Sequence, residues 1–311
     1  MSTLDNAYKQ FLLENAIITD TDKLFGTASE TELKIRSERP WNHNPKYFQH
    51  VKMSAIALMK IVMHAHSGGS LEIMGMLSGR VVDHTFIVLD AIPLPVEGTE
   101  TRVNAQDSAF VYMTEFREAS EKAGRYEHIC GWYHSHPGFG CWLSGIDVAT
   151  QRNNQMTDPF VAVVVDPVRT SAAGRVEIGS FRTFPHGYDD RSENTYSTST
   201  TVVPSAKFED FGANWREYYQ LETSFFKTSR DEKILQSLFR RFWSQTLASS
   251  PLKTSLPFLT DTLVDLHTQM TNQRGDRAAK QKVLQSTKRV ALDLMGAAAH
   301  EMAISRLFSH E

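Results

Sequence analysis

The spacing of apolar and polar positions divides the chain into a mixed α/β part and a helical part. The first regular signal is an apolar run from Ala55 to His66, which follows Ser54 and precedes Gly68-Gly69. Serine is a good helix N-cap and glycine commonly ends helices, so this run predicts a helix. Residues 107–122 carry apolar side chains three and four positions apart, which predicts a second, amphipathic helix.

Several stretches between and after these helices favour β-structure. Residues 160–165 are wholly apolar, mostly β-branched, and bounded by two Asp-Pro pairs, which predicts a strand buried on both faces. The other candidate strands are residues 71–77, 85–92, 129–134 and 176–184. Helices and strands in this order predict an α/β fold.

The composition changes after these strands. Residues 188–201 are rich in Ser, Thr and Asp, which is typical of a mobile loop. Ser229 to Glu232 has the form of a capping box, and apolar residues then recur at helical spacing almost to the end. The terminal apolar helix either folds back on its own domain or enters a bundle with other subunits, and periodicity leaves both open.

These signals give a division into three parts. The predicted parts are an N-terminal arm (1–46), an α/β domain (47–230) with an insertion at 93–110 and the mobile loop at 188–201, and a C-terminal helical region (231–311) for complex assembly.

Composition excludes several classes of protein. The chain has 33 basic and 36 acidic residues and a net charge of −3, so it lacks the basic excess expected of a nucleic-acid-binding protein. Its apolar runs fall short of the roughly 18 residues that span a membrane. Cys130 and Cys141 could form at most one disulfide, which favours a reducing compartment, the cytoplasm or the nucleus.

The candidate chemistry lies between residues 134 and 147. His134 and His136 are two positions apart at the end of a predicted strand and can therefore face the same point. Asp147 falls in the first turn of a helix that begins at Ser144. Two imidazoles and a carboxylate are ligands that zinc accepts, with a fourth position left for water.

Such a site also needs groups that are not metal ligands. Glu72, on the predicted strand 71–77, is the acid we expect to act as general base. Ser144 could donate a hydrogen bond to the oxyanion formed when hydroxide attacks a carbonyl.

The string His134-Ser135-His136, seven residues, Ser144, two residues and Asp147, with Glu72 upstream, resembles the JAMM motif of the MPN-domain metalloproteases. The resemblance covers about residues 47–230. It implies an MPN (JAMM) domain with a mixed, curved β-sheet flanked by helices. It also implies one Zn²⁺ held by His134, His136 and Asp147, proton transfer by Glu72, and support of the tetrahedral intermediate by Ser144.

Within that family, residues 131–138 are similar to two branches, the proteasome-lid deubiquitinase and the catalytic subunit of the COP-nine signalosome. Residues 95–106 resemble the insertion of the signalosome branch. That resemblance implies an isopeptidase that removes the ubiquitin-like modifier Nedd-eight from cullins. It further implies assembly with other signalosome subunits, including an MPN-domain partner, neddylated cullin-RING ligases as substrates, and a location in cytoplasm and nucleus.

Three alternatives compete with this hypothesis. The chain could be a proteasome-lid-type deubiquitinase, or a non-catalytic MPN scaffold, although a scaffold is expected to have lost ligands. A cysteine protease using Cys141 beside His136 is the third, but the apolar neighbours of Cys141 favour a raised thiol pKa.

The insertion at 93–110 is longer than the two to six residues usual for a strand-to-helix connection, and long loops are often lids. Glu97 or Glu100 could take the open zinc position. We favour Glu100, because Gly98 and Thr99 permit a close approach and Arg102 could pair with an acid in the closed form. The alternative is that both glutamates are solvated.

Overall fold

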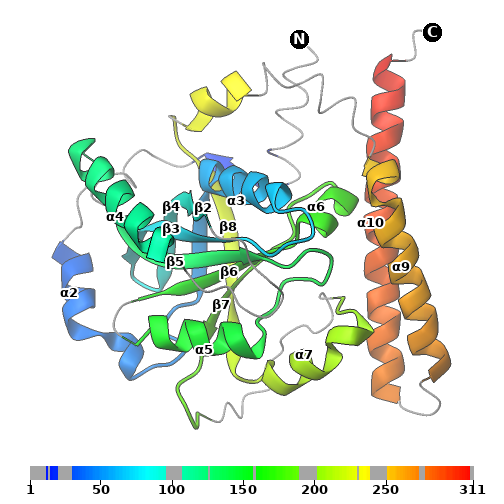
Figure 1. Cartoon of the computed structure of the whole chain (residues 1–311), viewed down its shortest axis with the longest axis horizontal. Helices are drawn as coiled ribbons and strands as arrows, with labels where there is room; N and C mark the ends of the chain where they lie inside the picture. Colours follow the sequence, from blue (N-terminus) through cyan, green and yellow to red (C-terminus); the bar gives the residue numbers. More distant parts are fainter. Residues whose placement is uncertain are drawn as a thin grey trace.

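A computed structural model describes residues 12, 15–19, 30–95, 107–124, 127–156, 159–188, 202–229, 231–238, 251–272 and 277–308 (Figure 1). Its strands are β1 (Ile18–Thr19), β2 (His50–Ser54), β3 (Met74–Val82), β4 (Thr85–Pro93), β5 (His128–Ser135), β6 (Val161–Val165), β7 (Ile178–Thr183) and β8 (Tyr218–Lys227). Its helices are α2 (Glu30–Glu38), α3 (Ala55–Ser67), α4 (Asp107–Lys122), α5 (Gly145–Asn154), α6 (Pro167–Ala173), α7 (Phe208–Asn214), α9 (Pro251–Asn272) and α10 (Arg277–Phe308), with short 3₁₀ turns at Pro40–Asn42 and Ser205–Lys207.

The strands form one mixed sheet in the order β1-β8-β2-β4-β3-β5-β6-β7. Because β7 also pairs with β8, the strands from β2 to β8 close into a ring, and β1 lies beside β8. The sheet contains parallel pairs, such as β5–β6 and β2–β8, and antiparallel pairs, such as β3–β5. The predicted α/β class with a mixed, curved sheet is therefore confirmed.

Two layers of side chains cover the two faces of the sheet. Figure 1 shows α3 across one face and α5 on the opposite side. Strand β6 supplies both layers, as the predicted doubly buried strand requires: all five residues are fully buried. Val163 packs in the layer that contains α3, whereas Val164 packs with Trp132 in the layer that contains α5. Alternation along a strand thus decides which side chains face α5.

The predicted helix after Ser54 is confirmed, and Ser54 caps it by accepting a hydrogen bond from Ala57 N. The strand predicted at 71–77 is wrong at its start. Strand β3 begins at Met74 and continues to Val82, because the turn through Gly68 and Gly69 includes Leu71, whose N–H donates to Gly68 O. Glu72 therefore lies in the segment before β3 and not on a strand.

The predicted capping box also differs. Thr228 and Asp231 exchange the reciprocal hydrogen bonds, Thr228 N to Asp231 Oδ2 at 3.0 Å and Asp231 N to Thr228 Oγ1 at 3.3 Å. The helical residues 229 and 231–238 therefore follow β8 directly, and their capping box lies one residue earlier than Ser229 and Glu232 suggested.

At the C-terminal end, α9 and α10 lie side by side and pack against α6, at the right of Figure 1. Leu259, Leu266, Val283 and Val290 are buried between them. Other large apolar side chains of this hairpin are exposed: Leu256, Leu263, Val264, Leu284, Leu292 and Met295. The hairpin therefore contacts its own domain and also presents an apolar surface. No described helix is long and apolar enough to cross a membrane.

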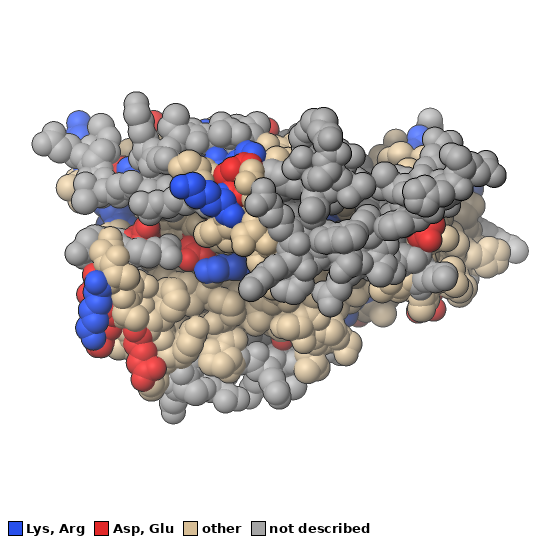
Figure 2. Space-filling model, turned by 90° about the horizontal axis from the view of Figure 1, so that it is seen from above, with Lys and Arg blue, Asp and Glu red and all other residues tan. Residues whose placement is uncertain are grey.

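Charges on the described surface are mixed. On the face drawn in Figure 2, acidic and basic side chains lie interspersed among uncharged residues. In the predicted N-terminal arm, α2 is tied to β3 by a buried ion pair between Glu32 and Arg80. Residues 96–106 and 189–201, which include most of the predicted insertion and mobile loop, lie outside the described residues.

Candidate metal centre

The end of β5 carries both candidate histidine ligands. His134 is the next-to-last residue of β5 and His136 follows the strand directly, so both side chains leave the sheet on the side of α5. The Trp132 ring stacks on the His134 ring, with centroids 4.7 Å apart and planes 15° apart. This packing holds one imidazole in a fixed orientation before any metal binds.

The third candidate ligand comes from the first turn of α5. Ser144 is the N-cap, and its side chain accepts a hydrogen bond from Asp147 N. In return, Asp147 Oδ2 accepts hydrogen bonds from Ser144 N at 2.9 Å and from Ser144 Oγ at 2.6 Å. The capping box therefore fixes the carboxylate at the same time as it starts the helix.

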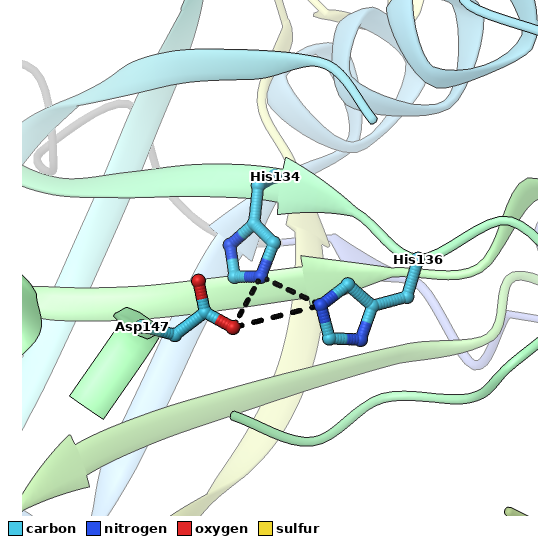
Figure 3. A group of neighbouring side chains, drawn as sticks. All are labelled: His134, His136 and Asp147. Atoms are coloured by element: carbon cyan, nitrogen blue, oxygen red, sulfur yellow. Dashed lines mark hydrogen bonds and ion pairs between the residues drawn. The ribbon is translucent and has the colours of Figure 1, made fainter. Parts of the chain in front are cut away.

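Three ligand atoms from these residues converge (Figure 3). His134 Nε2 lies 3.0 Å from His136 Nε2, and Asp147 Oδ2 lies 3.4 Å and 3.6 Å from these two nitrogens. Ligands about 2.0–2.1 Å from a tetrahedral zinc lie about 3.3 Å from one another. The spacing and the donor set both fit a zinc ion, and all three residues are buried.

The electrostatic surroundings of Asp147 and His136 favour the protonation states that bind a metal. Burial raises the pKa of Asp147, but the two imidazoles outweigh it and hold that pKa well below the usual range, so the carboxylate is charged. Burial and the neighbouring His134 lower the pKa of His136. Neutral His136 has one ring N–H, which Nδ1 donates to Gly140 O at 3.1 Å, leaving a lone pair on Nε2.

His134 differs from His136. Burial acts to lower the pKa of His134, but the nearby Asp147 carboxylate outweighs burial and raises it, and the Glu72 carboxylate acts in the same direction. An electrostatic effect of Glu72 on His134 means that this acid lies near the centre, although it is not one of the three converging ligands.

The segment that carries Glu72 is held by Ser135, the residue between the two histidines. Ile73 N donates to Ser135 Oγ at 3.0 Å, and Ser135 N donates to Ile73 O at 3.1 Å. Both backbone groups of the residue after Glu72 are thus bound to the ligand-bearing strand. Ser135 was not among the residues predicted from the sequence to belong to the site, although its position between two candidate ligands was an available signal.

The remaining candidate residues from the sequence are Glu100, Arg102 and Cys141. Glu100 and Arg102 lie outside the described residues. Cys141 Sγ donates to Glu177 O, and burial together with the Glu177 carboxylate raises the pKa of the thiol well above its usual value. A protonated thiol is a poor nucleophile, which argues against the cysteine-protease alternative.

The chain is similar to known proteins over most of its length. Residues 46–160 match the family model described as JAB1/Mov34/MPN/PAD-1 ubiquitin protease. The chain is 51% identical over 265 residues to the COP9 signalosome complex subunit 5 of Drosophila melanogaster, covering 84% of this chain and 80% of the fly protein. It is 46% identical over 297 residues to the protein of that name from Dictyostelium discoideum, covering 93% and 89%. The Caenorhabditis elegans protein of that name is 44% identical over 305 residues, covering 94% and 82%.

Proposed function

The chain belongs to the family of COP9 signalosome complex subunit 5, among the JAB/MPN-domain proteins, and from this premise we propose that it is a zinc-dependent isopeptidase. The bond it cleaves in this proposal joins the ubiquitin-like modifier Nedd-eight to a lysine of a cullin. The same resemblance that singled out the JAMM residues supports this substrate.

One observation carries the proposal. His134, His136 and Asp147 bring two imidazole nitrogens and one carboxylate oxygen to mutual distances of 3.0 to 3.6 Å in a buried site. Three protein ligands that leave one position open are typical of catalytic zinc sites. A non-catalytic scaffold has no need to retain all three.

Each residue has a distinct part in the proposed reaction. When bound, zinc lowers the pKa of water and polarises a carbonyl group. Glu72 accepts the proton from the attacking water and passes it to the leaving lysine amine. The Ser144 hydroxyl donates to Asp147 in this structure, so its predicted support of an oxyanion requires the O–H to turn away from the carboxylate.

The proposed partners follow from the same premise. We expect the chain to assemble with other signalosome subunits, among them an MPN-domain partner, and to act on neddylated cullin-RING ligases in the cytoplasm and nucleus. The exposed apolar side chains of α9 and α10 are available for packing against helices of other subunits.

The substitution Glu72→Gln tests the proposal. Because Glu72 is proposed to move a proton and not to bind metal, the variant should keep one zinc per chain and lose cleavage of neddylated cullin by about 10²–10⁴-fold. Elemental analysis and cleavage assays on the assembled complex measure the two effects. Removal of zinc by a chelator should abolish cleavage in the wild type, and added zinc should restore it.

Two results would contradict the proposal. Full activity in metal-free protein would exclude metal catalysis, and substantial turnover by Glu72→Gln would show that another group is the base. Faster cleavage of ubiquitin-linked than of Nedd-eight-linked substrate would favour the alternative, a deubiquitinase of the proteasome-lid type.

A further inference from the structure

Asp166 is a buried carboxylate that is not one of the three candidate metal ligands but is linked to one of them by hydrogen bonds. Asp166 follows β6 and is fully buried. It accepts three backbone hydrogen bonds, each 2.9 Å long. Oδ1 accepts from Arg169 N and Gly138 N, and Oδ2 accepts from Gly140 N. Only the bond from Arg169 N caps α6; the other two hold the loop that follows His136.

The backbone of this loop is shaped for both contacts. Gly138 and Gly140 have φ angles of +86° and +87°, in a region that L side chains rarely adopt. In this conformation the N–H of Gly140 points to Asp166, while the carbonyl of Gly140 accepts the His136 Nδ1–H at 3.1 Å. One peptide residue therefore connects a buried carboxylate to a metal ligand.

We infer that Asp166 is a positioning residue for the metal centre, acting on His136 through Gly140. By holding Gly140, it keeps the carbonyl where it fixes both the tautomer and the orientation of His136, so that Nε2 faces the other two ligands. This role rests on the proposed metal site. Groups that orient metal-bound histidines in this way typically change metal affinity by about 10–100-fold.

The substitution Asp166→Asn separates this role from capping. Asparagine keeps one acceptor oxygen, which can serve Arg169 N and Gly138 N, while its NH₂ group faces Gly140 N and cannot accept from it. Helix α6 should stay capped and only the contact to Gly140 should be lost. We expect the zinc dissociation constant, measured by competition with a chelator, to rise by about 10–100-fold.

A second variant keeps the test decisive if Asp166→Asn folds poorly. Serine caps helices as well as aspartate does, but it offers one short acceptor, so Asp166→Ser should keep the Arg169 bond and release both glycines. Its zinc affinity should fall at least as far. For both variants, the visible absorption spectrum of bound Co²⁺ should shift from that of the wild type, because the orientation of one ligand changes.

The matched control is Ser54→Ala. Ser54 is also a fully buried N-cap with a second buried contact, accepting from Ala57 N and donating to Leu89 O, but it belongs to α3 and touches no candidate ligand. Its loss should lower the melting temperature and leave zinc affinity and the Co²⁺ spectrum unchanged.

The outcomes separate this inference from the proposed function. If the wild type binds zinc and both Asp166 variants bind it equally well with an unchanged Co²⁺ spectrum, Asp166 has only a capping role and the inference is wrong. If the wild type binds no zinc, the metal centre itself is wrong and the inference falls with it.

Discussion

Two groups of buried ionisable side chains, one between α6 and α10 and one at the candidate metal centre, differ in how their charges are balanced. Between α6 and α10, Arg169 Nη2 lies 3.2 Å from Asp293 Oδ2, and Arg289 contacts both Asp293 and Glu177. Two guanidinium groups there face two carboxylates, and the formal charges cancel. In the metal centre, one carboxylate faces two imidazoles whose Nε2 atoms lie within 3.6 Å of it.

The difference distinguishes a structural cluster from a binding site. The cluster between α6 and α10, which we call the ionic cluster, pairs each guanidinium group with at least one carboxylate of the protein. The metal centre carries one net negative charge when its histidines are neutral, and its three donor atoms point at one another, an arrangement that a cation would stabilise. The first cluster should therefore matter for stability and the second for metal binding.

The largest effect is expected from Asp147→Asn. The substitution removes the only anionic ligand, so zinc should be lost and activity with it, whereas asparagine keeps an acceptor for Ser144 N and the start of α5 should persist. Elemental analysis should find less than a tenth of the wild-type zinc, and circular dichroism should find the secondary structure unchanged. A variant that retains stoichiometric zinc would show that the carboxylate is not a ligand.

The substitution Asp293→Ala should have the opposite pattern, a large loss of stability without a loss of zinc. Arg169 is 3% exposed and would lose its hydrogen-bonded carboxylate, which typically costs about 3–5 kcal/mol. Denaturant unfolding should show this loss of stability, while zinc content stays at the wild-type level. Lys288→Ala, at an exposed neighbouring position, should change stability by less than about 0.5 kcal/mol.

The double variant Arg169→Met with Asp293→Leu sharpens this comparison. Replacing a buried ion pair by apolar groups of similar volume is often neutral, so most of the lost stability should return. An Asp293→Ala variant as stable as the wild type would mean that α10 separates from α6 in solution.

The smallest effect is expected from Glu100→Ala. If Glu100 supplies a further anion to the metal centre in the free chain, its removal should raise cleavage of a small amide substrate by about fivefold or more, without changing zinc content. Glu97→Ala is the matched control and should have no effect. Equal rates for wild type and Glu100→Ala, both fully loaded with zinc, would show that the insertion does not block the site.

Much of the metal centre could be predicted because its parts are close in sequence. His134, His136 and Asp147 fall within 14 residues, and strand alternation and helix capping determine where each side chain points. The confirmed helix at Ala55 was equally local, since Ser54 marks its start.

The remaining features depend on partners that are distant in the chain. Arg169 and Asp293 are 124 positions apart, and Asp166 meets Gly140 across 26 positions. No periodicity identifies such pairs. The start of β3 was misjudged for the same reason, because the N–H of Ile73 is bound by the side chain of Ser135, 62 positions away, and not by a backbone carbonyl.

The closed ring also has a consequence for the order of events during synthesis. Strand β8 pairs with β2 on one side and with β7 on the other, and it is the last of the described strands to be made. Until residue 227 is available, β2 and β7 each have an open edge, which is a site for aggregation in a nascent chain. All three candidate ligands precede β8. The candidate metal ligands are thus synthesised before the ring of strands beside them can close. The rate of that closure, which depends on pairing across more than 160 residues, should limit the folding of the whole domain.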